Sequence, residues 1–239
     1  MSALAAAVPT VAPALRGTPL ADLPALLLPA YGQTLLMVGI VMALVVALGT
    51  PLGVVVFNTG PGGLFPAPRA HTALSWVVNL GRSLPFLILM AAIIPVTRLL
   101  VGTTIGIPAA VVPMTVAGVP FFARLVENAL RDVPVSVTEV ARVSGGSPWQ
   151  VVRRAQLHEA VPAIIGSATV NTIAMIEYSA IAGTIGAGGI GYVAVTYGYQ
   201  RFDHSVMVAT IVVLVATVAA VQFAGDRLAR RATPHLRRA

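Results

Sequence analysis

Residues 139–150 read EVARVSGGSPWQ and form the centre of a polar segment, 127–159, that lies between long apolar runs. Of the 239 residues, 57% are hydrophobic and 10% are charged, whereas a soluble domain carries roughly 25% charged residues. The composition therefore indicates a membrane protein. A charged, glycine-punctuated segment between two apolar runs is then a surface that such a protein offers to a partner in water.

Apolar runs of about 20 residues predict five transmembrane helices, because a run of that length crosses the hydrocarbon core. The runs are continuous and do not alternate, which argues against a β-barrel. We expect Pro113 and Pro120 to break the third span, and Pro24 and Pro29 to break a short stretch, 23–31, that lies along the interface. The spans are expected at residues 34–57, 73–96, 107–130, 161–182 and 205–223. The predicted fold class is an all-α polytopic membrane protein.

The distribution of arginine predicts the orientation. All fifteen basic residues are arginine, and twelve fall on the side that carries the polar segment, against three on the other side. Positive residues are retained in the cytoplasm, so the polar segment and the C-terminus are expected there, and the N-terminus outside. The arginines flank spans and form no basic face with interleaved aromatics, so no nucleic-acid partner is expected. The regions are an extracytoplasmic or interfacial segment, 1–33, a transmembrane domain, 34–225, with a cytoplasmic loop, 124–160, and a basic tail, 226–239.

Capping signals predict two short helices in the polar segment. Thr138 can cap a helix that starts at Glu139, whose carboxylate suits a helix N-terminus. Gly145-Gly146 end that helix, because glycine adopts left-handed geometry without a Cβ clash. Ser147 then caps a second helix with Pro148 at its first position. Two consecutive capped helices indicate that this segment folds into a defined structural element.

The side chains on these helices predict a docking surface. Trp149 and Val152 are expected to form an apolar knob, with Gln150, Arg153 and Arg154 as a polar rim. An exposed aromatic anchor with polar groups around it is typical of interface hot spots. A plain surface connection between two spans is the alternative interpretation.

This segment resembles the EAA loop of bacterial ABC importer permeases, through Glu139-Val140-Ala141, then Gly145, Leu157 and Pro162. From about Gln33 to Arg231 the chain resembles the D/L-methionine importer branch of that family. That match rests on residues 82–89 (RSLPFLIL), 94–97 (IPVT), 120–124 (PFFAR), 178–180 (YSA), 183–191 (GTIGAGGIG), 197–202 (YGYQRF) and 222–227 (QFAGDR). Two positions depart from the family pattern: His158 stands where the family has a proline, and Glu177 where it has a small residue.

The resemblance implies a type I ABC importer permease fold in the bacterial inner membrane. It implies a second copy of the chain, a cytoplasmic ATPase dimer and an extracytoplasmic binding lipoprotein as partners, with ATP and Mg on the ATPase. No catalytic residue and no cofactor is implied on this chain. Transport of methionine, or of another amino acid or small metabolite, follows alternating access as the ATPase dimer closes. The coupling residues are Glu139, Ala141, Gly145, Pro148, Trp149, Gln150, Arg153 and Leu157.

Polar and aromatic residues within the spans are candidates for the translocation path: Asn79, Arg82, Pro85, Phe86, Asn171, Glu177, Tyr178 and Ser179. A carboxylate in hydrocarbon is costly, so Glu177 is expected either to contact the ammonium group of an amino-acid substrate or to lie near the outer headgroups. Arg82 either reaches the cytoplasmic surface or lines the path. Asn171 and Thr172 are expected to hydrogen-bond between helices, and the methionines of the spans to serve in packing.

A glycine-rich run, 183–191, lies on the outer side by the arginine count and lacks the Lys-Ser/Thr of a phosphate-binding loop. It is expected to form a turn that fits closely against the binding protein, through Gly183, Gly186, Gly188, Gly189 and Gly191. His158 and His204 fall on opposite sides of the membrane, so no metal site is expected.

The alternative from a different class is a proton-coupled secondary transporter with Glu177 as the proton carrier. No internal repeat supports it, and it predicts uptake without ATP. A membrane-embedded enzyme is disfavoured, because the sequence offers no paired carboxylates, Ser–His arrangement or metal cluster.

Overall fold

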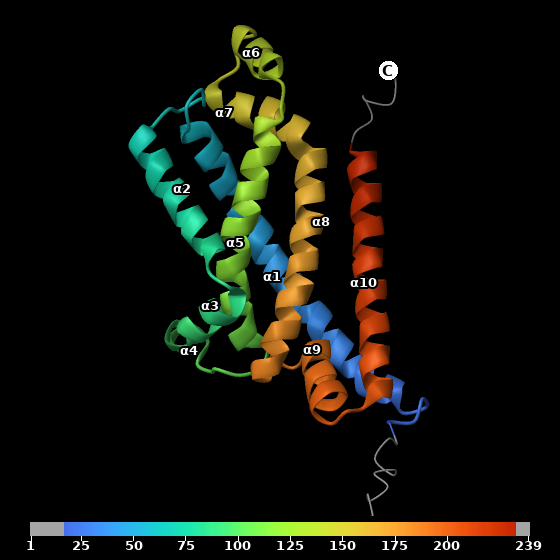
Figure 1. The fold of residues 1–239 in the computed structure, drawn as a ribbon. Coiled ribbons are helices and arrows are strands. Elements are labelled where there is room, and N and C mark those ends of the chain that lie inside the picture. Colours follow the sequence, from blue (N-terminus) through green and yellow to red (C-terminus); the bar gives the residue numbers. More distant parts are fainter. Residues whose placement is uncertain (1–16, 233–239) are drawn as a thin grey trace, which may run out of the picture.

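The computed structural model describes residues 17–232 as a bundle of helices (Figure 1). Four helical stretches are long and apolar enough to cross a membrane, and a bent pair supplies a fifth if it counts as one span. The long helices are α1 (Leu23–Thr59), α5 (Ile107–Arg131), α8 (Leu157–Ala182) and α10 (His204–Arg231). The all-α polytopic fold class is confirmed, with four or five spans against the five predicted.

The second span is not the single helix that was predicted. It consists of α2 (Pro68–Ser83) and α3 (Phe86–Ala92), bent by 103° at the break, and α4 (Ile94–Val101) follows. Leu84 is extended, with φ −89° and ψ 129°, and Pro85 precedes the first residue of α3. The residue before a proline is pushed out of the helical region, which accounts for the position of the break.

The other prolines do not break their helices, so those predictions are wrong. Pro113 and Pro120 lie inside the continuous helix α5. Pro24 is in the first turn of α1, where proline is tolerated. Pro29 lies inside α1 one turn later, and the stretch 23–31 packs through Leu23 and Leu27 in one cluster with Ile190 and Val206. Burial against α9 and α10 outweighs the hydrogen bond that a proline removes.

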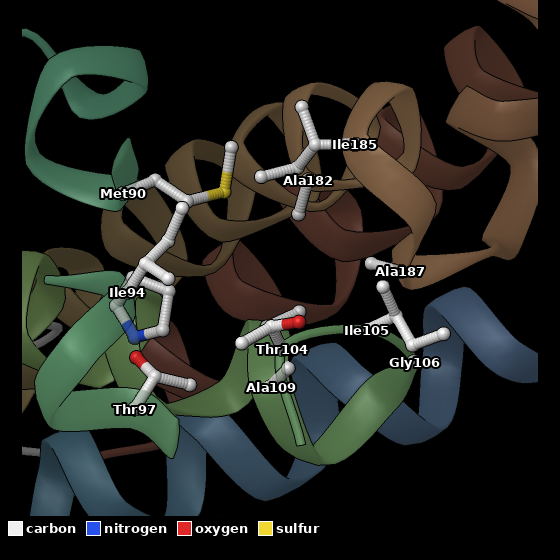
Figure 2. Close-up of a pocket in the computed structure, with 12 residues that line it drawn as sticks. Met90, Ile94, Thr97, Thr104, Ile105, Gly106, Ala109, Ala182, Ile185 and Ala187 are labelled. Atoms are coloured by element: carbon white, nitrogen blue, oxygen red, sulfur yellow. The ribbon is translucent and has the colours of Figure 1, made fainter. Parts of the chain in front are cut away.

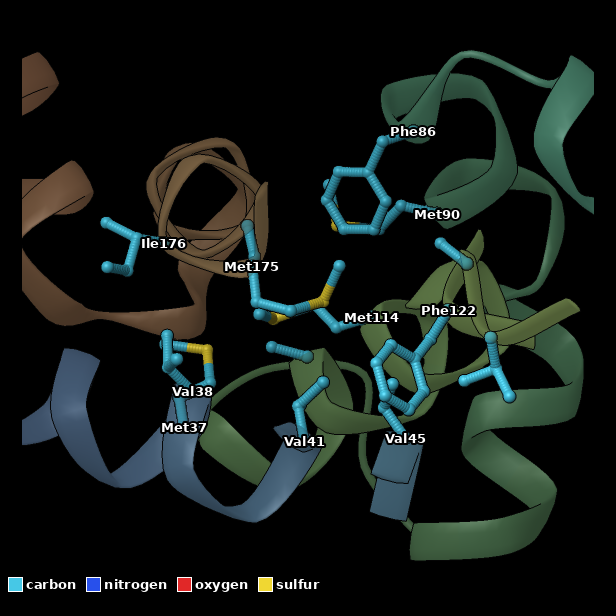
Figure 3. Packing of buried hydrophobic residues seen from close by; sticks show 14 of the residues in the cluster. Met37, Val38, Val41, Val45, Phe86, Met90, Met114, Phe122, Met175 and Ile176 are labelled. Atoms are coloured by element: carbon cyan, nitrogen blue, oxygen red, sulfur yellow. The ribbon is translucent and has the colours of Figure 1, made fainter. Parts of the chain in front are cut away.

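The core lies where α1, α5 and α8 meet. Met37 and Val45 from α1, Met114 and Phe122 from α5, and Met175 from α8 converge there (Figure 3), and all five are fully buried. The expected packing role of the methionines is confirmed. Close approach of α1 and α5 requires glycine, because a Cβ on Gly53 would lie 2.5 Å from the carbonyl oxygen of Ala123.

The short helices lie at the two ends of the bundle. Figure 1 shows α6 (Val135–Val143), α7 (Pro148–Val151) and the end of α10 at one end. At the other end lie α4, α9 (Gly189–Val193) and the start of α1. A π segment follows α7 (Val152–Gln156) and another follows α9 (Ala194–Gln200), while α8 is followed by Gly183–Ala187, which is kinked because Ile185 and Gly186 are not helical. Residues 226–231 of the expected basic tail belong to α10, while residues 1–16 and 233–239 lie outside the described residues.

Candidate functional site

The polar segment folds as helix, turn, helix, as predicted. We call α6, α7 and the following π segment the α6–α7 element, residues 135–156. Gly145 has φ +81°, a conformation that favours glycine. The amide of Gly146 donates to the carbonyl oxygen of Ala141 at 3.1 Å, and a Cβ on Gly146 would lie 2.7 Å from that oxygen. The two glycines therefore hold the two helices close together.

One predicted cap is present and the other is not. The backbone amide of Gln150 donates to Ser147 Oγ at 3.4 Å, and that of Ser147 donates to Gln150 Oε1 at 2.9 Å, a complete capping box. The Thr138 cap is wrong, because α6 begins at Val135 and Thr138 lies inside it. Pro134, with φ −56° and ψ 133°, precedes the helix and sets its start one turn earlier.

The exposed surface of the α6–α7 element differs from the predicted knob in one residue. Trp149 is 62% exposed, and Glu139, Gln150, Arg153 and Arg154 are exposed around the same turn and helices. Val152 is 1% exposed and belongs to the core cluster, so its place in an exposed knob is wrong. The large apolar side chains that are exposed in this element are Val135, Val140, Val143 and Trp149.

A cluster of charges that sequence reasoning missed lies at the same end of α5. The carboxylate of Glu127 is fully buried and accepts hydrogen bonds from Arg124 at 2.5 Å and Arg131 at 2.6 Å. Arg124 also donates to Asn79 Oδ1 of α2 at 2.8 Å. The spacings i, i+3 and i, i+4 could have indicated the pairing. The burial of Glu127 and the contact to α2 depend on tertiary packing.

The predicted path residues of α2 and α3 do not lie in one cluster. Phe86 stacks on Tyr178 of α8, with ring centroids 4.2 Å apart and an interplanar angle of 3°. Asn79 binds Arg124 instead of lying in that group. Arg82 is exposed in the single chain, and its guanidinium lies 5.8 Å from the centre of the Phe121 ring. The structure thus brings Phe86 and Tyr178 together and leaves Arg82 apart from them.

Asn171 and Thr172 of α8 make no hydrogen bond to another helix among the described residues, so that prediction is wrong. Thr172 donates to the carbonyl of Ala168 in its own helix, at 2.7 Å. Ser179 donates to that of Ile176, also at 2.7 Å. The side chain of Asn171 is buried and has no hydrogen-bond partner among the described residues. Glu177 is exposed on the surface of the single chain.

The glycine run packs largely against its own chain. Gly186, Gly188 and Gly189 have φ of +98°, +81° and +80°. The amide of Gly189 donates to Gln33 Oε1 at 2.8 Å, and a Cβ on Gly191 would lie 2.3 Å from the backbone of Ala180. Gly183, Gly189 and Gly191 are buried, and Gly186 is exposed. Most of these glycines therefore allow the run to pack closely against α1 and α8, and a partner protein can contact only the exposed residues of the run.

A small apolar recess of about 20 Å³ lies between α3, α4, the start of α5 and this glycine run (Figure 2). Met90, Thr97, Gly106 and Ile185 are among the residues that line it. Its volume is that of about one water molecule, which is too small for an amino acid.

Asp203 fastens the chain at the start of α10. Its carboxylate accepts hydrogen bonds from the amide and hydroxyl of Thr18, at 2.8 and 2.6 Å, and from the amide of Val206 at 3.1 Å. The hydroxyl of Thr18 lowers the pKa of Asp203 below its usual value, since these bonds favour the charged carboxylate.

The described residues thus form an all-helical membrane bundle that displays a folded helix pair with an exposed tryptophan at one end. The sequence model of the family described as "Binding-protein-dependent transport system inner membrane component" matches residues 37–238. The chain belongs to this family, and it is a permease subunit of an ABC importer, as the sequence resemblance implied.

Individual relatives agree with this assignment. The chain is 49% identical to the "Probable D-methionine transport system permease protein MetI" of Vibrio cholerae, over 86% of this chain and 92% of the relative. Identity to the protein of the same description from Pasteurella multocida is 42%, over 83% and 92%. A solved structure described as inward facing conformations of the MetNI methionine ABC transporter superposes with a TM-score of 0.87 at 39% identity, over 90% of this chain and 100% of that one.

Proposed function

We propose that this permease imports methionine. The observation that carries the proposal is its 49% identity, over nearly the whole length, to a relative described as a D-methionine transport permease. The TM-score of 0.87 to a chain from a methionine ABC transporter supports it. The chain contributes a path through the membrane and no covalent chemistry, and ATP with Mg is bound by the partner ATPase.

The α6–α7 element docks into the cytoplasmic ATPase in this proposal. Trp149 is the exposed anchor, Gln150 and Arg153 surround it, and Glu139 and Ala141 belong to the helix across the turn. The turn at Gly145, the first helical residue Pro148 and the junction at Leu157 hold these groups in place. The element then lies in the cytoplasm together with the end of α10, and the start of α1 lies outside.

The translocation path forms between two copies of the chain. Arg82 and Glu177 are exposed in the single chain although both belong to spans, and a charged side chain in a span is expected to face a partner or a water-filled path. Arg82 suits the carboxylate of an amino acid and Glu177 its ammonium group. Phe86, which follows Pro85, stacks on Tyr178 and forms an apolar gate beside them.

The exposed part of the glycine run faces the binding lipoprotein. Thr184, Ile185 and Gly186 are exposed at the end of the bundle opposite the α6–α7 element. Gly188 and Gly189 support this turn through their close approach to Gln33 and Thr34 of α1, and Gly191 supports it through close approach to Ala180 of α8.

Uptake into proteoliposomes tests the function. The permease is reconstituted with its ATPase and binding lipoprotein, and labelled L-methionine is followed with and without ATP. ATP-dependent uptake that excess unlabelled methionine suppresses supports the proposal. ATP hydrolysis stimulated by the binding protein without methionine uptake contradicts the substrate, and uptake by the chain alone on a proton gradient contradicts the coupling mechanism.

A further inference from the structure

The π segment Val152–Gln156, the last part of the α6–α7 element, joins α7 to α8 of the membrane bundle. The helix does not stop there: the π segment Val152–Gln156 continues α7 into α8, and the amide of Leu157 donates to the carbonyl of Val152 five residues back. Figure 1 shows α7 lying across the end of the bundle and α8 running along it, so the chain changes direction over this segment. A π segment interrupts the regular hydrogen-bond ladder of a helix and is frequent at functional sites.

A buried pair of amide side chains ties this bend to the end of α1. Gln156, the last residue of the π segment, accepts a hydrogen bond from Asn58 Nδ2 at 3.1 Å. The same Nδ2 group donates to the carbonyl of Val54 at 3.0 Å, so its two hydrogens are both used. Asn58 is 2% exposed and Gln156 is 3% exposed. Two residues 98 positions apart in the sequence are therefore joined in a dry environment.

Neighbouring contacts hold both residues of this hydrogen bond in place. The carbonyl of Asn58 accepts from the amide of Phe65, which fastens the loop after α1 at 3.0 Å. On the other side, Val152 and Ala155 of the π segment are buried. Because the pair is buried, opening it leaves further buried polar groups without partners, which is costlier than opening a surface hydrogen bond.

We propose that the Asn58–Gln156 bond is the joint that passes the displacement of the α6–α7 element to α1. This inference rests on the proposed docking of that element to the ATPase. A push on α7 reaches α8 only through the π segment, where the helix is most easily bent. With Gln156 held to Asn58, the bend cannot absorb the push, and α1 moves with α7 and α8. The two amides are positioning residues that touch neither ATP nor substrate.

The experiment compares transport with ATP hydrolysis in the reconstituted complex of permease, ATPase and binding protein. Gln156→Met removes the amide at nearly constant volume, and Gln156→Asn keeps it but withdraws it by one methylene. The pair Asn58→Gln/Gln156→Asn moves that methylene across the bond and restores the reach. Thr59→Val is the matched control, because Thr59 adjoins Asn58 but its hydroxyl bonds carbonyls of its own helix. The quantity measured is labelled L-methionine moved per ATP hydrolysed.

We expect each Gln156 single variant to lower this ratio about fivefold, the factor that corresponds to a hydrogen bond of about 1 kcal/mol. The double variant Asn58→Gln/Gln156→Asn restores most of the wild-type ratio of methionine moved to ATP hydrolysed, and Thr59→Val leaves that ratio unchanged. A single variant that melts at a lower temperature with an unchanged ratio overturns the proposal, since a merely structural bond does that. If Gln156→Met fails to assemble, Gln156→Asn and the double variant decide the question in the same way.

Failure of the underlying docking role would look different. Trp149→Ala then leaves the binding of the ATPase to the permease unchanged, whatever the Gln156 variants do. If Trp149→Ala weakens ATPase binding while the Gln156 variants keep the wild-type ratio, docking stands and the joint is refuted.

Discussion

Replacing Glu127 tests how the end of α5 is held. Its carboxylate is fully buried, while the Arg124 side chain is 18% exposed and the Arg131 side chain is 57% exposed. Breaking a buried ion pair costs about 3–5 kcal/mol because a charge is left unpaired, whereas a pair that reaches solvent contributes about 0–1 kcal/mol. We therefore expect Glu127→Gln to destabilise the permease by about 3 kcal/mol, and Arg131→Met by about 1 kcal/mol or less.

The assay is thermal unfolding of the purified complex in detergent, followed by the loss of the intact size-exclusion peak. One kcal/mol shifts the midpoint by about 2–4 °C for a chain of this length, so Glu127→Gln lowers it by about 6–12 °C and Arg131→Met by about 4 °C at most. Arg124→Met lowers the midpoint more than Arg131→Met, because it removes the less exposed partner of the buried carboxylate, leaves it with Arg131 alone and also frees Asn79 of α2. Equal effects of Arg124→Met and Arg131→Met, or a shift below about 2 °C for Glu127→Gln, would refute this reasoning.

Three further predictions concern the ends and the middle of the bundle. Glu139→Arg leaves the permease inserted and dimeric but unable to stimulate its ATPase, and normal transport by this variant contradicts the docking role; Arg142→Ala on the same helix serves as the comparison. Asp203→Asn lowers the melting midpoint at pH 7, because the Thr18 bonds that lower the pKa of Asp203 favour the carboxylate. Since the folded-state pKa is the lower one, this stabilisation is complete above the usual aspartate pKa of about 3.9 and is lost as the pH falls through the folded value. The difference in melting midpoint between wild type and variant therefore disappears at acidic pH, and a difference that does not depend on pH would contradict the assignment. Phe86→Ala removes the stack on Tyr178 and raises ATP hydrolysis without methionine, since the apolar gate is opened; hydrolysis as low as in wild type would show that the stack does not seal the path.

Local signals in the sequence predicted the features that depend on a few neighbouring residues. The apolar runs predicted the spans, and Ser147 and Pro148 predicted the start of α7, because a helix cap depends on a few neighbouring residues of backbone; the structure added Gln150 as the second half of a capping box. Gly145 predicted the turn between the two short helices for the same reason. The family resemblance, carried by short motifs, indicated the importer class.

Only the tertiary structure decided which faces of these helices are buried. The spacing of Trp149 and Val152 in the sequence does not show that Val152 packs inward while Trp149 stays exposed, because burial there depends on which neighbouring helices each side chain meets. Pro29, Pro113 and Pro120 read locally as breaks, yet packing of their helices keeps them continuous. The Asn58–Gln156 bond and the contact of Arg124 with Asn79 join residues 98 and 45 positions apart. Such contacts depend on how helices approach one another in space, and no short stretch of sequence encodes that approach.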